Sequence, residues 1–198
     1  MNKNVERGRA TRAHLVEVAT RLFAEHGYDG TSIETVQASA GVSRGSLYHH
    51  FPGKEALFRA VYETVEAEVV ARVMQAAASE TSPWDAVRAG LSAFLDACLE
   101  PAFRRIVVLD SVSVLQSKVL EIGIDPVELP MLRTVLTPLL GATVFGGIAI
   151  DALTYVALGG LYGASLYIAR ASDPRAARAE VDLVLDTLVS GLLRGASG

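Results

Sequence analysis

Hydrogen-bond donors suited to anions are concentrated in residues 31–55, which have the sequence TSIETVQASAGVSRGSLYHHFPGKE. This stretch contains the cations Arg44 and Lys54, the phenol of Tyr48 and several serine hydroxyls. Guanidinium and ammonium groups bind phosphate oxygens, and an arginine can also form a bidentate contact with guanine. These residue types indicate nucleic-acid binding if the fold presents them on one surface.

Local signals predict two short helices joined by a tight turn. Thr31 is expected to cap the first helix, with Glu34 three positions later completing a capping box. Gly41 provides the left-handed residue that ends this helix, and Ser43 caps the next one. The sequence Pro52-Gly53 then breaks the second helix, and Lys54 opens another. This arrangement is typical of a helix-turn-helix.

The segment before this motif is expected to contain one helix from about Arg9 to His26, which Gly27 ends. Residues 2–9 are polar and carry basic side chains. They are interpreted either as a solvated flexible tail or as an arm that reaches toward a DNA groove.

The motif resembles the DNA-binding signature of the TetR family of bacterial transcriptional regulators. The resemblance covers roughly the first 60 residues, and Gln37 departs from it because the family usually has alanine there. The packing between the two short helices is therefore expected to differ slightly. The matching elements are Gly27-Tyr28, Thr31-Ser32, Ala40-Gly41-Val42-Ser43, Gly45-x-Leu47-Tyr48, His50-Phe51 and Lys54-Glu55.

The resemblance implies roles for individual residues. Tyr48 and His50 match phosphate-contacting positions of the family, although Tyr48 can also be interpreted as a half-buried surface aromatic. Arg44 matches a position that contacts base edges, with a phosphate contact as its alternative role. Lys54 begins a helix whose free N–H groups also suit a phosphate. The DNA-binding residues expected are Thr31, Ser32, Ser43, Arg44, Gly45, Ser46, Tyr48, His49, His50 and Lys54.

Composition predicts an all-α protein with two functional parts. The 198 residues are 51% hydrophobic and show few strand-like alternations. The net charge of −4 divides unevenly, because residues 1–60 carry +2 and the remainder carries −6. We expect a DNA-binding domain over residues 1–52 and a larger helical ligand-binding and dimerisation domain over residues 53–198. The polar N-terminus lacks an apolar signal segment, so a cytoplasmic location is expected.

Several helices are expected in the larger domain. A long one from Gly53 to about Ala78 would span about 40 Å, and others should begin at Pro83, Pro101 and Asp125. Residues 152–169 carry no charge, but their glycines make them poorly suited to lipid, so they are expected to form a helix buried on nearly all sides. Together with the apolar stripe of a last helix capped by Asp173, they predict a homodimer through residues 151–194.

The sequence favours an effector-binding regulator over an enzyme. No motif of a hydrolase, phosphate loop or metalloprotease occurs, and neither a cofactor nor a metal is expected. Most of the family represses, so repression relieved by a small, mostly apolar effector is expected; a helix-turn-helix regulator without an effector and, less favoured, a helical enzyme remain the alternatives. The effector, operator, target genes and TetR subgroup do not follow from the sequence. Candidate ligand-lining residues are Phe94, Cys98, Phe103, Met131, Phe145 and Tyr155.

Overall fold

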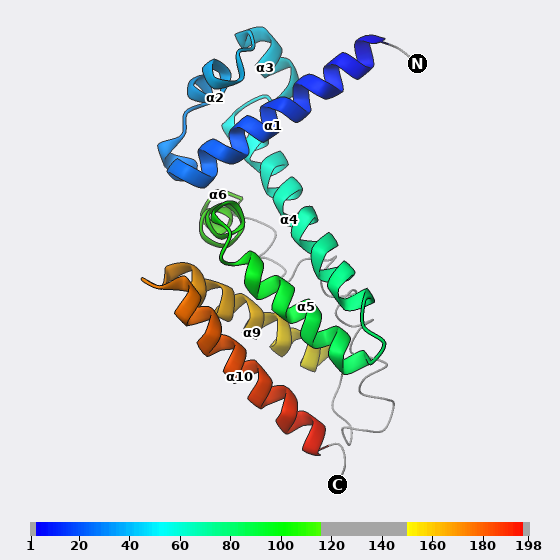
Figure 1. Ribbon diagram of the computed structural model, residues 1–198. Helices are drawn as coiled ribbons and strands as arrows, with labels where there is room; N and C mark the ends of the chain where they lie inside the picture. Colours follow the sequence, from blue (N-terminus) through cyan, green and yellow to red (C-terminus); the bar gives the residue numbers. More distant parts are fainter. Residues whose placement is uncertain (1–2, 116–149, 196–198) are drawn as a thin grey trace. The chain divides into compact units, whose positions relative to one another are not determined.

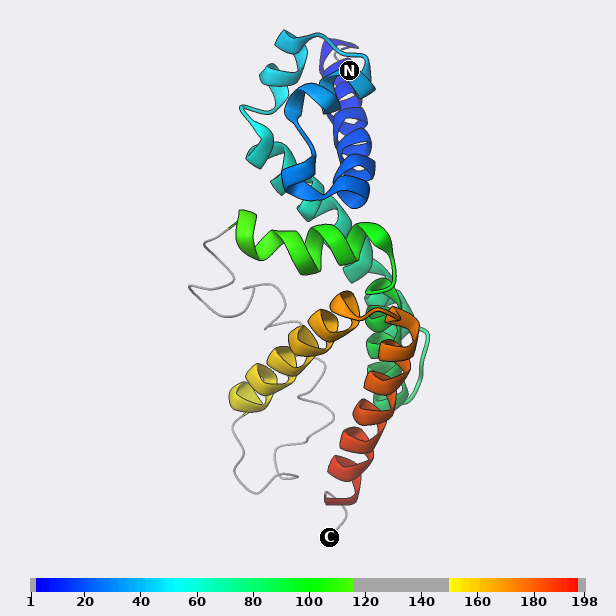
Figure 2. The same ribbon diagram turned by 90° about the vertical axis from the view of Figure 1, so that its left-hand side faces the viewer.

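The described part of the chain is helical, and it contains no β-strand. The structure is a computed structural model that describes residues 3–115 and 150–195 (Figures 1 and 2). Its internal contacts divide these residues into two compact units. Unit 1 comprises residues 3–68 and 100–115, and unit 2 comprises residues 69–99 and 150–195. The all-α prediction is confirmed.

Unit 1 is organised around the first helix, α1 (Lys3–Gly30). The short helices α2 (Ile33–Ala40) and α3 (Arg44–His50) lie beside it, followed by the first part of α4 (Lys54–Ala78) (Figure 1). The imidazole Nε2 of His14 on α1 lies 3.3 Å from the carbonyl oxygen of Ala40, which joins α1 to the end of α2. The largest fully buried side chains of this core are Leu15, Val18, Phe23, Val36, Leu47, Leu57, Phe58, Val61 and Ile106.

Helix α1 differs from the sequence-based prediction at both ends. It begins at Lys3, so the interpretation of residues 2–9 as a flexible tail is wrong for residues 3–9. At Gly27 the backbone turns to φ 72° and ψ 175°, which interrupts the helix where its end was expected. A further turn then extends to Gly30. The left-handed φ at position 27 favours glycine because any larger residue places its Cβ against the backbone.

A second segment of unit 1 comes from much later in the sequence. The π-helix η1 (Phe103–Asp110) and the short helix α6 (Ser111–Val114) follow one another, and η1 packs against α1. In an α-helix, residues five apart lie about 140° apart around the axis, whereas π winding with its i→i+5 hydrogen bonds brings them closer to one face. Arg105 and Asp110 have this spacing, and they form an ion pair at 3.2 Å.

Unit 2 contains the end of α4, α5 (Pro83–Ala97), α9 (Ile150–Arg170) and α10 (Pro174–Gly195) (Figure 2). The starts of two helices match the prediction. The Ser82 hydroxyl accepts the N–H of Asp85, and the Asp173 carboxylate accepts two N–H groups at the start of α10. The helix predicted from Asp125 and the bend expected near Gly141 lie outside the described residues.

Two ion pairs join helices α5 and α10 among the described residues: Arg88 pairs with Asp186 at 3.9 Å, and Arg178 makes the closer contact. The Arg178 guanidinium donates to Asp96 Oδ1 at 2.9 Å and to Ser92 Oγ at 2.8 Å, and it also pairs with Asp182 at 3.1 Å. Because this side chain is only 17% exposed, its charge is better protected from solvent screening than that of either carboxylate partner. The contact fixes the register between α5 and α10.

One face of α9 and α10 is exposed in the single chain. Val156 on α9 is 72% exposed and Leu183 on α10 is 71% exposed. The expectation that residues 152–169 are buried on nearly all sides is therefore wrong for a single chain, in which α9 buries Thr154, Ser165, Ile168 and Ala169. The other large apolar residues exposed on this face are Tyr155, Tyr162, Tyr167, Val184 and Leu188.

Candidate nucleic-acid interface

The turn between α2 and α3 is held by local hydrogen bonds. The Ser32 hydroxyl accepts the N–H of Thr35 at 3.0 Å, which caps α2. Gly41 adopts φ 64° in the left-handed region and donates its N–H back to the end of α2. The Ser43 hydroxyl accepts the N–H of Ser46 at 3.2 Å and caps α3. The predicted roles of Gly41 and Ser43 are confirmed, and these local signals fix where α3 begins.

Gln37 strengthens this turn. Its side-chain Nε2 donates to the carbonyl oxygen of Val42 at 3.0 Å, so the amide spans from α2 to the residue that precedes the α3 cap. An alanine at this position would lack the donor. The departure from the family pattern is thus accommodated as an additional hydrogen bond across the turn.

Helix α3 has one buried side and one exposed side. Leu47 is 1% exposed and Phe51, which follows the helix, is 2% exposed, so both anchor it to the core. Arg44, Gly45, Tyr48 and His49 lie on the exposed side. The Arg44 guanidinium carbon lies 5.5 Å from the centroid of the Tyr48 ring, within the range of a cation–π contact. No acidic residue occurs in α3, so this surface suits an anionic partner.

Gly45, on the exposed side of α3, has open space around it. A Cβ placed on Gly45 would meet nothing within 4 Å. Packing within the chain therefore does not require a glycine at this position. Its small size leaves the start of α3 open to close approach from outside.

Lys54, at the start of α4, lies over the ring of Tyr28, a residue that matched the family signature but was not among the predicted DNA-binding residues. Its ammonium nitrogen is 3.9 Å from the centroid of the Tyr28 ring. Glu55, the next residue, forms an ion pair with Arg59 one turn later at 3.2 Å. Burial, together with the carboxylates of Glu55 and Asp29, raises the pKa of the Tyr28 phenol, so the ring stays neutral at physiological pH.

The first turns of α1 lie beside the end of α3. Gly8 is close to His50, because a Cβ at position 8 would lie 3.9 Å from the imidazole Cε1. One turn later, the Arg12 guanidinium carbon lies 5.1 Å from the centroid of the Phe51 ring. Arg12, which was not among the predicted DNA-binding residues, is four positions from Gly8 and so lies on the same helical face.

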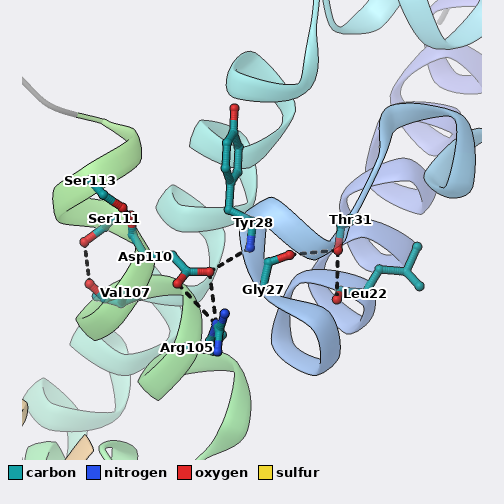
Figure 3. A network of polar contacts seen from close by, with 9 residues as sticks. All are labelled: Leu22, Gly27, Tyr28, Thr31, Arg105, Val107, Asp110, Ser111 and Ser113. Carbon is teal, nitrogen blue, oxygen red and sulfur yellow. Dashed lines mark hydrogen bonds and ion pairs between the residues drawn. The ribbon is translucent and has the colours of Figure 1, made fainter. Parts of the chain in front are cut away.

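Thr31 has a structural role that differs from the predicted one. Its hydroxyl donates to the carbonyl oxygen of Gly27 at 2.9 Å and also lies 3.2 Å from that of Leu22, while Ser32 is the cap of α2. Thr31 is 1% exposed. The prediction that Thr31 caps α2 is wrong, and its buried hydroxyl is not available to DNA in this structure. It instead fixes the kink in α1 (Figure 3).

A carboxylate from η1 completes the same network. Asp110 Oδ2 accepts the backbone N–H of Tyr28 at 2.7 Å, and the Asp110 carboxylate also pairs with Arg105 (Figure 3). The Arg105 guanidinium lies against Gly27, where a Cβ would come within 2.1 Å of Nη2. The kink that precedes Tyr28 is therefore held from two sides, by Thr31 and by the Arg105–Asp110 pair.

The six candidate ligand-lining residues are divided between the two units and the residues outside the described ranges. Phe94 is partly buried, whereas Cys98 and Phe103 are buried; Phe94 and Cys98 belong to unit 2 and Phe103 to unit 1. Burial raises the pKa of the Cys98 thiol to about 12, which makes it an unreactive apolar group at neutral pH. Tyr155 is 47% exposed and lies on the open face of α9. Met131 and Phe145 lie outside the described residues.

Two family models match this chain. Residues 15–61 match the model described as bacterial regulatory proteins, tetR family, and residues 84–192 match the Tetracyclin repressor-like C-terminal domain. The second match alone covers more than half of the chain. The chain belongs to the TetR family of bacterial transcriptional regulators.

Similar proteins include other TetR-family regulators. A TetR-family regulator from Pectobacterium atrosepticum has a crystal structure that is 30% identical, covers 97% of both chains and gives a TM-score of 0.80. A second, from Streptomyces coelicolor, is 25% identical, covers 100% of this chain and 97% of that one, and gives a TM-score of 0.69. The transcriptional repressor AcnR of Corynebacterium efficiens is 32% identical over 102 residues, which cover 48% of this chain. The match spans 54% of AcnR.

Helix α9 needs a separate interpretation because it is long and apolar enough to cross a membrane by length and composition. The core helix of a soluble protein meets the same criterion. In this chain the helix falls within the residues that match the C-terminal domain of TetR-like regulators. Its place in that domain favours packing against protein over insertion into lipid.

Proposed function

We propose that this TetR-family regulator is a cytoplasmic, homodimeric repressor that leaves its operator when a small, mostly apolar effector binds. Residues 1–52 would form the DNA-binding domain, and residues 53–198 would bind the effector and dimerise. The proposal depends most on one observation, the acid-free exposed side of α3 next to Lys54 at the start of α4. These proteins are regulators rather than enzymes, and we extend that assignment to this chain.

The proposed DNA contacts fall into two kinds. Arg44, exposed at the start of α3, would make a bidentate contact with a guanine. Tyr48, His50 and Lys54 would bind phosphates, which sets orientation without discriminating between sequences. Gly45 would let the backbone of α3 approach the groove. Ser32, Ser43, Ser46 and His49 complete the proposed contact set, from which the buried Thr31 is left out.

The exposed apolar face of α9 and α10 supports a dimer. Val156 and Leu183 are each more than half exposed, although clustered apolar side chains of this size favour burial. A second copy would present the same face, as a two-fold interface requires. We propose that this face, within residues 151–194, forms the four-helix dimer interface. A partner helix could approach closely where a Cβ would meet no atom within 4 Å, at the exposed Gly159, Gly160 and Gly163.

Dimerisation would also explain how a small change can release DNA. A dimer contacts two half-sites roughly 34–36 Å apart, so a change in the separation of the two DNA-binding domains weakens both contacts together. An effector can shift this balance only by its differential affinity for the two arrangements. Repression is favoured because AcnR, one of the similar proteins, is a repressor.

The main experiment is selection of bound sequences from a random DNA pool by the full-length protein. Enrichment of a two-fold symmetric site with half-sites about one helical turn apart is expected for a dimer. Recovery of unenriched sequences would count against sequence-specific binding. The selected site then supplies the DNA for all later affinity measurements.

A thermal-shift screen against apolar small molecules would test the effector part. A ligand that binds the native state raises the melting temperature. Thermodynamic reciprocity then requires that saturating operator weakens this ligand by the same factor by which the ligand weakens operator binding. A ligand that binds tightly and leaves operator affinity unchanged would favour a regulator without effector control. Turnover of the ligand would favour an enzyme.

A further inference from the structure

Tyr28 contacts the proposed DNA-binding residue Lys54 on one side and the η1 segment on the other. Its backbone N–H donates to Asp110 Oδ2 at 2.7 Å, and its ring centroid lies 3.9 Å from the Lys54 ammonium. Figure 3 shows the ring pointing away from Asp110 while the backbone nitrogen faces it. All three residues belong to unit 1. A single residue therefore connects a carboxylate of η1 with the first residue of α4.

The Tyr28 ring is itself firmly held. It stacks on Phe23 with centroids 6.0 Å apart and makes an edge contact with Phe58 at 5.0 Å. Phe23 and Phe58 are fully buried. The ring thus provides a fixed surface for the flexible lysine side chain that lies over it.

The contact between ring and ammonium suits a phosphate ligand. The ring quadrupole attracts a cation without taking a lone pair from it, so the ammonium N–H groups remain able to donate to an oxygen. A free lysine side chain loses considerable rotamer freedom when it is immobilised. A lysine already restricted by the ring loses less of that freedom on binding DNA, which strengthens the phosphate contact.

Asp110 holds the backbone of Tyr28. Its side chain is 14% exposed, and it accepts the N–H of Tyr28 while pairing with Arg105 at 3.2 Å. Tyr28 follows the kink at Gly27, where the backbone changes direction. The hydrogen bond that the Tyr28 N–H donates to Asp110 therefore fixes the first residue after the kink. Without this acceptor, the N–H of Tyr28 would lose its partner and the residue could rotate about the kink.

We propose that Tyr28 positions the Lys54 ammonium for a DNA phosphate and that Asp110, through the Tyr28 N–H, holds Tyr28 in place. Tyr28 and Asp110 are thus positioning residues that need not touch DNA. The inference rests on the proposed phosphate contact of Lys54. It assigns to a carboxylate outside the helix-turn-helix an effect on that contact through Tyr28.

The first test uses the protein without DNA. Protons above an aromatic ring resonate upfield, so the ε-methylene protons of Lys54 should be shifted upfield in the NMR spectrum of the wild type. The shift should persist in Tyr28→Phe, which keeps the ring, and disappear in Tyr28→Leu. Asp110→Ala should reduce it, and Asp110→Asn, whose amide oxygen can still accept the N–H, should retain more of it. Unshifted Lys54 protons in the wild type, or a shift unaffected by Asp110→Ala, would overturn the proposal.

The second test measures binding to a random-sequence DNA duplex over a range of salt concentrations, because phosphate contacts do not depend on sequence. Lys54→Ala should reduce the salt dependence by about one phosphate contact. Tyr28→Leu should weaken binding roughly two- to tenfold, because the lysine side chain must then be ordered when DNA binds. In the Lys54→Ala background, Tyr28→Leu should have no further effect. Tyr28→Phe serves as the matched control.

These outcomes test the phosphate contact of Lys54 separately from the positioning role of Tyr28 and Asp110. An unchanged salt dependence in Lys54→Ala would contradict the proposed phosphate contact. The NMR shift would still show whether the Tyr28 ring and Asp110 position the lysine. A reduced salt dependence, with an equal effect of Tyr28→Leu whether or not Lys54 is present, would overturn the positioning role alone. If Tyr28→Leu fails to fold, the wild type, Tyr28→Phe and the two Asp110 variants decide the question.

Discussion

The Arg105 guanidinium occupies the space that a side chain on Gly27 would need. A Cβ at position 27 would lie 2.1 Å from Arg105 Nη2 and 2.6 Å from its central carbon, while the backbone there has a φ of 72°. Two independent demands for glycine thus coincide at the kink of α1. One comes from the backbone conformation and the other from a side chain of η1.

Replacing Gly27 with alanine should destabilise the protein by more than the left-handed backbone alone costs. At φ 72° and ψ 175° the backbone is in a region that is essentially restricted to glycine, which costs other residues roughly 1–3 kcal/mol, and displacement of Arg105 from Asp110 adds to it. The matched control is Gly27→Ala in an Arg105→Ala background, which keeps the same backbone conformation and removes the guanidinium beside position 27. Chemical denaturation should give a larger loss for Gly27→Ala in the wild type than in the Arg105→Ala background. Equal losses would show that Arg105 moves away without cost.

Replacing Arg44 with alanine tests base contact at α3. The loss of a bidentate contact with guanine should cost roughly 1–3 kcal/mol and relax the preference at one position in each half-site. Affinities of the variant for the selected operator and for its single-base derivatives would measure this. A uniform loss for all derivatives, with unchanged preference, would instead assign Arg44 to a phosphate.

Replacing Leu188 with arginine tests the proposed dimer. Leu188 is 58% exposed in the single chain, so the arginine should be tolerated within one chain but would bury an unpaired charge in a dimer. We expect light scattering to show a wild-type dimer and a shift of the variant toward monomer. Leu188→Ala, which shortens the same side chain without adding a charge, provides the matched control. A stable wild-type monomer at micromolar concentration would contradict the proposal.

Cys98 should make stability fall at alkaline pH. Burial raises the pKa of its thiol from 9.0 to about 12, so between these values the unfolded chain loses this proton while the folded chain keeps it. The contribution is fully present below pH 9.0 and is lost as the pH rises toward 12. At one pH unit above the unfolded pKa the loss is about 1.4 kcal/mol. Chemical denaturation of the wild type and of Cys98→Ala, below the unfolded pKa and one pH unit above it, would measure this loss of stability. If the stability of both proteins fell equally with pH, the prediction would be wrong.

The features predicted correctly from the sequence are mostly local. Gly41, Ser43 and Asp173 were assigned correctly, because a cap depends on residues only two or three positions away. The same reasoning chose Thr31 over its neighbour Ser32, although both can cap a helix. Only tertiary packing distinguishes them, since the Thr31 hydroxyl is directed to the α1 kink.

The features that the sequence did not predict depend on distant pairs. Asp110 and Tyr28 are separated by 82 positions, and no local periodicity connects a carboxylate with a backbone N–H over that distance. The exposed face of α9 is a similar case, because the uncharged sequence indicates burial without specifying the partner. In both cases the sequence shows the kind of residue, and only the folded structure shows which part of the protein that residue contacts or leaves exposed.

Gly45 has a consequence for engineering operator specificity. Glycine is less favourable in a helix than alanine, by at most about 1 kcal/mol, and a Cβ at position 45 would meet no atom of the chain within 4 Å. In a library sorted for folding alone, larger residues should therefore accumulate at this position. In the same library sorted for DNA binding they should be depleted, wherever the groove comes close to the backbone of α3. The difference between the two enrichments would map, one side-chain size at a time, how near the DNA lies to this helix.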